Sequence, residues 1–477
     1  MSSSAQPPTP FWILRHHSPS PVTALAFCKL DDAVQDFNGV RFVESDDDED
    51  SSSSSSNVND GRIAGERQSA EGVDERPHLL AGDSNGKVSL TSLHSSSSTV
   101  GRYRPALFWQ AHKEGSSVLG VEQWVGTDLI VTHGRDNAAR VWQSSRKEAP
   151  VGESKSTDEQ GTYEGKDDRR PHLLLQIDVN ALNFCRFSLL PLRTADKDEA
   201  LLAVPHTLES GWIDVYRLSL TACNNGNECK ASFTRVHSAI GKSDGSQRTT
   251  AGTGRAAIVM SMHLVKRSCD EDGTLGVVAG YEDGSIKMWQ HQERQGWSVA
   301  WQVKIHRESV LSTALSQEMP LSAANTETVL LASAGADDRL GVVRLPPDDT
   351  QTELDKTVFP TSKAGRSSVA LHLCGDPEQQ RHRLPLLLVG GWDGRARLYS
   401  LSNADDGATS KGASPDTLKL DCIAVLRYHK ESVQCVALAT VGSGCSQSPG
   451  GNVVAAVGGK EGRVSLWSVS EHDTEPK

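Results

Sequence analysis

The stretch LIVTHGRDNAARVWQ, residues 129–143, decides the fold of this chain. It reads as a short apolar strand, a turn rich in Gly and Asp, and a second strand that ends in an aromatic residue. Seven such stretches recur, beginning at Leu79, Leu129, Leu201, Gly276, Leu331, Leu386 and Val453. A single hairpin cannot bury its own apolar face, so the recurrence predicts a repeat protein whose units pack against one another.

The sequence around each repeat predicts two further strands, which makes a blade of four. Apolar, β-prone runs before the repeats are expected to form the inner strands. These runs begin at Val22, Val118, Ala181, Ala257, Val310, Ser368 and Val433. Outer strands are expected after the first six repeats, at residues 106–112, 172–178, 232–237, 298–306, weakly near Lys356, and at 420–429.

The seventh repeat lacks an outer strand after it, and the missing strand is predicted at the other end of the chain. PFWILRHHSPSPV, from Pro10, matches outer-to-inner passages such as WQVKIHRESV, residues 301–310. Phe11–Arg15 is therefore expected to complete the last blade, which closes the ring and removes its free edges. The sequence predicts an all-β fold, a seven-bladed β-propeller closed by the N-terminal strand, as a single domain over residues 1–477.

Long polar insertions are predicted to gather on one face of the propeller. The loops between inner and second strands, and between third and outer strands, lie on that face. The insertions span residues 28–78, 144–171, 188–199, 317–328, 402–417 and 440–452, whereas only 238–254 interrupts the opposite face. We call this opposite face, made of the outer-to-inner loops and the middle hairpin turns, the short-loop face. It is the better candidate for a docking surface.

The insertion at 28–78 contains SDDDEDSSSSSSN, which begins at Ser45. Such a segment cannot bury apolar surface, so most of this loop is expected to be disordered. A solvated loop is the favoured interpretation. The alternative is phosphorylation of Ser45, which precedes Asp46–Asp48 and would gain further negative charge.

Composition narrows the classes of function. The net charge is −12, which argues against a domain built to wrap a phosphate backbone, and no direct nucleic-acid binding is expected. The 9 cysteines include no Cys-x-x-Cys pair, so no zinc site or disulfide framework is indicated. No apolar run approaches the ~18 residues of a membrane span, and no secretory signal is recognised at the start. No cofactor-binding motif is present, so no cofactor is expected.

The residues that look most catalytic recur once per blade. The sets are His112, Thr132, Asp136 and Trp142; His306, Ser333 and Asp337; Asp283 and Trp289 with His237; and His429, Glu461 and Trp467. A Ser–His–Asp triad would suit a hydrolase. A nucleophile site is unique, however, so the repetition favours structural hydrogen-bond networks and predicts no enzyme activity. His16 and His17 are adjacent on a strand and point to opposite faces, so a loop-capping role is favoured over a metal site.

Three residues in or beside middle hairpin turns are candidates for partner contact: Trp392, Tyr281 and Arg135. Aromatic residues and Arg contribute much of the binding energy at protein interfaces. The alternative is that these large side chains pack on a neighbouring blade.

The sevenfold pattern resembles WD40-type propellers, although Gln143, Gln290 and Ser468 stand where the Asp of the Trp-Asp dipeptide usually follows the aromatic. PPTPFWILRHHSPSPVTALAF, residues 7–27, and GGKEGRVSLW, residues 458–467, resemble the ASTRA-associated protein 1 family of fungal WD-repeat proteins. The acidic insertion and the weak fifth blade depart from a compact member of that family.

The resemblance implies a non-catalytic scaffold in a nuclear ASTRA-type complex, with other protein subunits as partners. That assembly is linked to chromatin remodelling and to the cochaperone-assisted stability of phosphatidylinositol-3-kinase-like kinases. A nuclear location follows, with a cytoplasmic pool left open. Two alternatives remain at this point: a histone- or chromatin-reading adaptor, and a substrate receptor of a ubiquitin ligase, although the Trp-Asp-x-Arg typical of the latter is absent after Trp142, Trp289 and Trp467.

Overall fold

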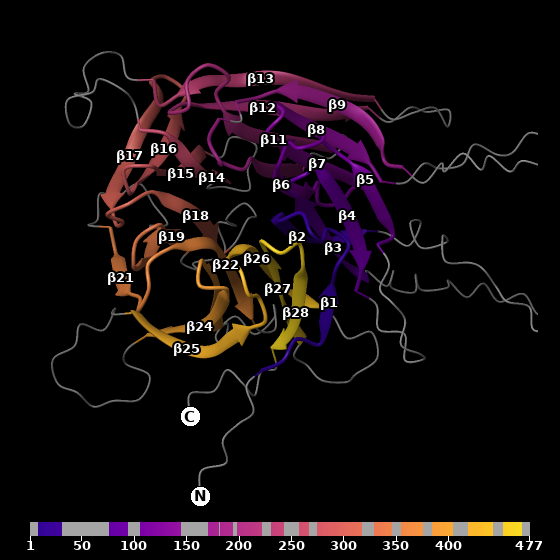
Figure 1. Ribbon diagram of the computed structural model, residues 1–477. Helices are drawn as coiled ribbons and strands as arrows, with labels where there is room; N and C mark the ends of the chain where they lie inside the picture. Colours follow the sequence, from indigo (N-terminus) through magenta and orange to yellow (C-terminus); the bar gives the residue numbers. More distant parts are fainter. Residues whose placement is uncertain are drawn as a thin grey trace, which may run out of the picture.

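The computed structural model describes residues 8–30, 76–93, 105–144, 170–180, 182–193, 198–221, 230–242, 257–266, 274–316, 329–345, 354–374, 384–403, 418–441 and 452–469. These residues form seven antiparallel sheets of four strands each, arranged as the blades of a ring, as Figure 1 shows. No helix occurs among them, and so none that could span a membrane. The predicted all-β, seven-bladed WD40-type propeller is confirmed.

In the first six blades the strands follow one another in chain order from the inner to the outer edge. Blade one holds β2 (Val22–Leu30), β3 (Arg76–Asp83), β4 (Lys87–Ser92) and β5 (Leu107–Gln110), and blade two holds β6 (Val118–Gln123), β7 (Leu129–Gly134), β8 (Ala138–Gln143) and β9 (His172–Asp178). Blade three holds β10 (Ser188–Arg193), β11 (Asp198–Pro205), β12 (Ile213–Thr221) and β13 (Lys230–Ile240), and blade four holds β14 (Val259–Lys266), β15 (Leu275–Tyr281), β16 (Ser285–Gln292) and β17 (Gly296–Lys304).

Blades five and six keep the same order, and blade seven takes its outer strand from the N-terminal end of the chain. Blade five holds β18 (Val310–Leu315), β19 (Val329–Gly335), β20 (Arg339–Leu345) and β21 (Lys356–Pro360), and blade six holds β22 (Arg366–Cys374), β23 (Leu384–Gly391), β24 (Arg395–Asn403) and β25 (Leu418–Arg427). Blade seven holds β26 (Val433–Val441), β27 (Asn452–Gly459), β28 (Val464–Val469) and, as its outer strand, β1 (Trp12–Leu14).

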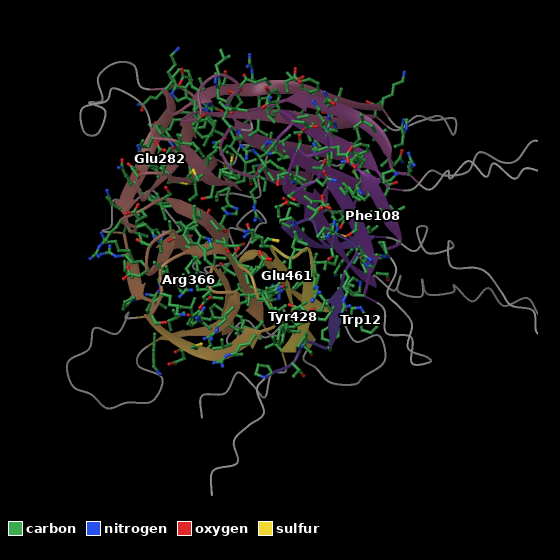
Figure 2. All side chains as sticks on the ribbon, in the orientation of Figure 1. Trp12, Phe108, Glu282, Arg366, Tyr428 and Glu461 are labelled. Atoms are coloured by element: carbon green, nitrogen blue, oxygen red, sulfur yellow. The ribbon has the colours of Figure 1, made fainter. Side chains whose placement is uncertain are left out.

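The ring closes as the sequence predicts. β1 pairs antiparallel with β28, with Trp12 opposite Leu466 and Leu14 opposite Val464. The amide of Phe11 adds a hydrogen bond to the carbonyl of Leu466 at 3.0 Å. In Figure 1 the indigo β1 lies beside the yellow β28, and in Figure 2 Trp12 marks this junction. The first and last described strands therefore share one blade, which leaves no open edge in the ring.

Neighbouring blades are held together by apolar contact where each inner strand begins. In most blades a valine occupies this position, and it packs against a glycine of the preceding blade. A Cβ on Gly82 would come within 2.6 Å of a Val118 methyl, and one on Gly390 within 2.7 Å of a Val433 methyl. Glycine is needed there because the backbone and the branched side chain approach so closely. The close packing joins the blades into one continuous core.

One strand prediction was wrong. The inner strand of blade three is β10, Ser188–Arg193, and not the run that begins at Ala181. Two asparagines hold the preceding residues as a loop: the Asn180 side chain accepts from the Leu182 amide at 2.9 Å, and Asn183 donates to the Val259 carbonyl at 2.6 Å. The first six residues of the insertion predicted at 188–199 are therefore the inner strand itself, and the loop follows them.

Most other predicted insertions lie outside the described residues. The acidic insertion at 28–78 connects β2 to β3, which themselves include its first and last three residues. Ser45 and nearly all of 144–171 also lie outside the described residues. The disorder of these loops and the phosphorylation of Ser45 stay predictions.

Candidate interaction face

Blade two contains a closed chain of hydrogen bonds among the residues that the sequence singles out. His112 Nδ1 lies 2.8 Å from Asp136 Oδ1, and its Nε2 lies 2.9 Å from Thr132 Oγ1. The Trp142 indole donates to the same Thr132 oxygen at 2.9 Å. Asp136 also accepts from the Lys113 amide at 3.0 Å, so the network ties the outer-to-inner loop to the hairpin turn.

The protonation states of blade two follow from burial. Burial lowers the pKa of His112, and the hydrogen bond with Asp136 offsets this only in part. Burial acts to raise the pKa of Asp136, but the hydrogen bonds from His112 and the Lys113 amide outweigh it and hold that pKa well below its usual range. A neutral imidazole thus donates from Nδ1 to a carboxylate and accepts at Nε2 from the Thr132 hydroxyl.

Blade five places a serine, a histidine and a carboxylate in the order of a hydrolytic triad. His306 Nδ1 lies 2.8 Å from Asp337, and its Nε2 lies 3.0 Å from Ser333 Oγ. Ser333 and His306 are each only 1% exposed, however, so no substrate can approach the hydroxyl. Asp337 also accepts from the Arg307 amide at 2.7 Å, as Asp136 does from its loop. The geometry is that of a structural network rather than an active site.

Blades seven and one contain variants of this network. In blade seven, His429 lies 2.7 Å from Glu461 and 3.1 Å from Ser465, which also accepts from the Trp467 indole at 2.9 Å. In blade one, His17 lies 2.8 Å from Asp83 and 2.9 Å from Ser89. His17 is thus buried inside the blade, in the loop-anchoring position expected for it.

Blade four does not form the predicted set. His237 lies on β13 of blade three, where its ring centroid is 4.5 Å from that of His291 and 5.1 Å from that of Trp297, which it meets edge to face. Asp283 accepts instead from the amide and hydroxyl of Ser285, at 2.9 and 2.6 Å. The Trp289 indole donates to the hydroxyl of Tyr281 at 2.8 Å. His237 is therefore not a partner of Asp283.

The prediction that Tyr281 contacts a partner is also wrong. It is only 3% exposed, and its hydroxyl accepts from Trp289 inside the blade. Burial raises the pKa of this phenol strongly, so it stays protonated. Tyr281 is a core residue in this structure, and the packing alternative holds for it.

Blade six lacks the histidine, and an arginine takes its place. Arg366 begins β22, whereas most of the other inner strands begin with valine, and it is 1% exposed. Its Nη1 lies 2.8 Å from where a Cβ on Gly391 would sit, the place that histidine rings occupy in blades two and five. Within the described residues its three guanidinium nitrogens have no hydrogen-bond partner. Figure 2 labels Arg366 inside this blade.

The carboxylate of blade six is held by a second arginine. Arg397 donates to Asp393 from Nη2 at 2.6 Å and from Nη1 at 3.2 Å. Burial acts to raise the pKa of Asp393, but the hydrogen bonds from Arg397 outweigh it and lower that pKa. Burial, together with the charge of Arg397, lowers the pKa of Arg366. One carboxylate therefore faces two cations.

The other two predicted contact residues lie on the short-loop face. Trp392 is 52% exposed, and its ring lies on the backbone of Gly365. Arg135 is exposed and stacks on the ring of Phe184, with 4.6 Å from its guanidinium carbon to the ring centroid. They belong to blades six and two, so the structure does not bring them together into one site.

Sequence reasoning missed an apolar group between blades two and three. Leu182, Phe184 and Leu208 are 76%, 64% and 84% exposed. The loop that carries the first two is joined to the turn that carries the third, because Asn180 donates to the hydroxyl of Ser210 at 3.3 Å. The missed signal is the pair of asparagines, which favour a loop over a strand.

The described residues contain no cluster of three or more His, Cys, Asp or Glu side chains that could hold a metal ion. Cys28, Cys185, Cys422 and Cys435 are free cysteines.

No family model matches the chain. The chain is 27% identical over 431 residues to ASTRA-associated protein 1 of Verticillium alfalfae, a match that covers 83% of this chain and 88% of the relative. It is 27% identical over 422 residues to the protein of that name from Schizosaccharomyces japonicus, covering 82% and 92%. Among solved structures, Sqt1 of Chaetomium thermophilum bound to the N-terminus of ribosomal protein L10 matches with a TM-score of 0.50 at 13% identity, covering 97% and 100% of the two chains, which shows the fold.

Proposed function

Since the chain is a relative of the fungal ASTRA-associated protein 1 over more than four-fifths of its length, we propose that it is a non-catalytic scaffold subunit of a nuclear ASTRA-type complex. The proposal includes a link to chromatin remodelling and to the cochaperone-assisted stability of phosphatidylinositol-3-kinase-like kinases. Its partners would be the other protein subunits of that assembly. The name of the relatives and the propeller fold support a scaffold or adaptor role.

One observation carries the non-catalytic part of this proposal. In blade five, where a serine, a histidine and a carboxylate stand in the order of a triad, Ser333 and His306 are buried and hydrogen-bonded to each other. The same type of network recurs in blades one, two, five and seven, where it anchors a loop to a hairpin turn. A network repeated in this way stabilises the ring, and it leaves the short-loop face free for partners.

Purification of the tagged full-length chain from its native cells, followed by mass spectrometry, tests the proposal. We expect subunits of an ASTRA-type assembly, cochaperones and kinases of the named class, together with nuclear fluorescence of a tagged chain. Recovery of a cullin-type ubiquitin ligase or of histones alone would favour the alternative functions. Recovery of no stable protein partner would contradict a scaffold role.

A further inference from the structure

The short-loop face carries a positively charged hollow on blade five. The hollow measures about 360 Å³ and is lined by Lys304, Ile305, Arg307, Asp338, Arg339, Val358 and Pro360. Three of these side chains are cations and one is a carboxylate, while Ile305, Val358 and Pro360 supply apolar walls. A net positive hollow is unexpected on a chain whose net charge is −12.

The surrounding contacts fix this charge in place. Arg339 Nη1 donates to the carbonyl of Ile305 at 2.9 Å, which fixes its guanidinium at the hollow. The adjacent carboxylate of Asp337 is occupied inside the blade by His306 and by the Arg307 amide. Asp338 is then the one carboxylate in the lining, and Lys304 and Arg307 remain exposed.

A short loop joins the hollow to Trp392 on blade six. The amide of Thr361 donates to the Asp338 carbonyl at 2.7 Å, and that of Gly365 donates to the Asp337 carbonyl at 3.1 Å. At the other end, the Trp392 amide donates to the Gly365 carbonyl at 3.1 Å. Lys363, between the two ends, is exposed. Backbone hydrogen bonds thus link the hollow, the loop and Trp392, which we together call the five–six strip.

We propose that the five–six strip binds an acidic segment of a partner protein that carries an apolar or aromatic side chain. That side chain packs on Trp392, while its carboxylates lie against Lys363 and the cations of the hollow. Tryptophan and arginine dominate binding energy at interfaces, and complementary charge selects the partner. The apolar walls suit a polypeptide better than a phosphate backbone. This inference rests on the proposed scaffold function and names the chemistry of one partner.

Photo-crosslinking of the full-length chain in native cell extract tests the proposal. A benzophenone amino acid placed at Ser362, which is exposed in the loop, leaves Lys363 and Trp392 intact. The matched control places it at Val125, which is 57% exposed in the turn between β6 and β7 on the opposite face. We expect mass spectrometry of the Ser362 product to show an acidic peptide with an apolar residue, absent from the Val125 product.

Reversing the charge of two residues of the strip then tests whether the crosslinked peptide binds the strip or only lies near it. Arg307→Glu combined with Lys363→Glu should lower the crosslinking yield roughly tenfold or more, the equivalent of about 1.4 kcal/mol. A crosslinked peptide that is neutral or basic, a nucleic acid, or this chain's own 44–57 segment would overturn the proposal. So would an unchanged yield in the double variant. If all partners still copurify with the double variant, the binding role of the strip is refuted and the scaffold function is not. If no partner copurifies with the wild type or with the double variant, the scaffold function is refuted.

Discussion

Blades two and six build the same hairpin around a carboxylate, but by different means. In blade two, Asp136 orients a neutral His112, and the chain of hydrogen bonds continues to Trp142. In blade six, within the described residues, no histidine pairs with the carboxylate; Asp393 is hydrogen-bonded to Arg397 and interacts electrostatically with Arg366. Both carboxylates pair with an arginine four residues on, Asp136 with Arg140 and Asp393 with Arg397. The two blades differ in the buried group that the outer-to-inner passage supplies, which is a neutral histidine in blade two and a cationic arginine in blade six. Blade six, with its network altered, is also the blade that leaves Trp392 exposed.

The largest effect is expected from Asp393→Asn. The substitution leaves two cations without a compensating charge, one of them 1% exposed, and removing one partner of a buried ion pair is costly. We expect a loss of about 3 kcal/mol in the free energy of unfolding, measured in urea. In an Arg366→Met background the same substitution should cost at least about 1 kcal/mol less. Strictly additive losses would show that Arg366 does not depend on Asp393.

Asp136→Asn should have the next largest effect. The amide keeps the shape of the side chain but presents a donor where His112, Arg140 or the Lys113 amide also donates. We expect a loss of about 2 kcal/mol in the free energy of unfolding. In a His112→Gln background Asp136→Asn should cost less, because the histidine that hydrogen-bonds to the Asp136 carboxylate is then absent. A loss below about 0.5 kcal/mol would contradict the fastening role of Asp136.

Acidic pH should lower the stability of the fold through His133 of blade two, a histidine that has no counterpart in blade six. His133 is fully buried, and burial lowers its pKa to about 3, with the neighbouring His112 contributing. The unfolded chain protonates near pH 6.5 while the folded one does not, so stability is complete above pH 6.5 and falls as the pH decreases towards 3. One pH unit below 6.5 should cost about 1.4 kcal/mol through this residue.

Alanine at position 133 isolates this contribution. Blade five has Ala334 at the corresponding place in its hairpin register, so the small side chain suits the fold there. Between pH 7 and pH 5.5, His133→Ala should lose less stability than the wild type by about 1.4 kcal/mol. Equal pH dependence of the two proteins would mean that His133 takes up its proton in the folded state.

The features of this comparison that depend on sequence spacing could be predicted. Those that depend on how one strand pairs or packs against another could not. The period of the hairpins gives the seven blades, and the match of Phe11–Arg15 to other outer strands gives the ring closure. The histidine of blade five is found because the passage HRESV, residues 306–310, resembles HKESV, residues 429–433, at the start of blade seven. His237 likewise ends a predicted outer strand, but it stands 22 residues before β14 of blade four, and its ring lies beside that of His291.

Burial of single side chains could not be predicted. Tyr281 and Trp392 are both aromatic residues at middle hairpin turns, but Tyr281 sits one position earlier relative to the carboxylate and points into the blade. Arg366 stands where the pattern has valine, and only the three-dimensional structure shows its guanidinium in the place of a histidine ring. These features depend on contacts between segments that no local pattern specifies.

The smallest effect on folding should come from Trp392→Ala, and it sharpens the contrast between the two blades. Half of this side chain is already in water, and the ring rests on Gly365 rather than in the core. We expect a change of about 0.5 kcal/mol or less in the free energy of unfolding. Trp142→Phe is the matched control, because Trp142 is 8% exposed and its indole donates to Thr132, and it should cost about 1 kcal/mol. If Trp392→Ala were the more destabilising of the two, Trp392 would be a folding residue, and its exposure would no longer support a docking role.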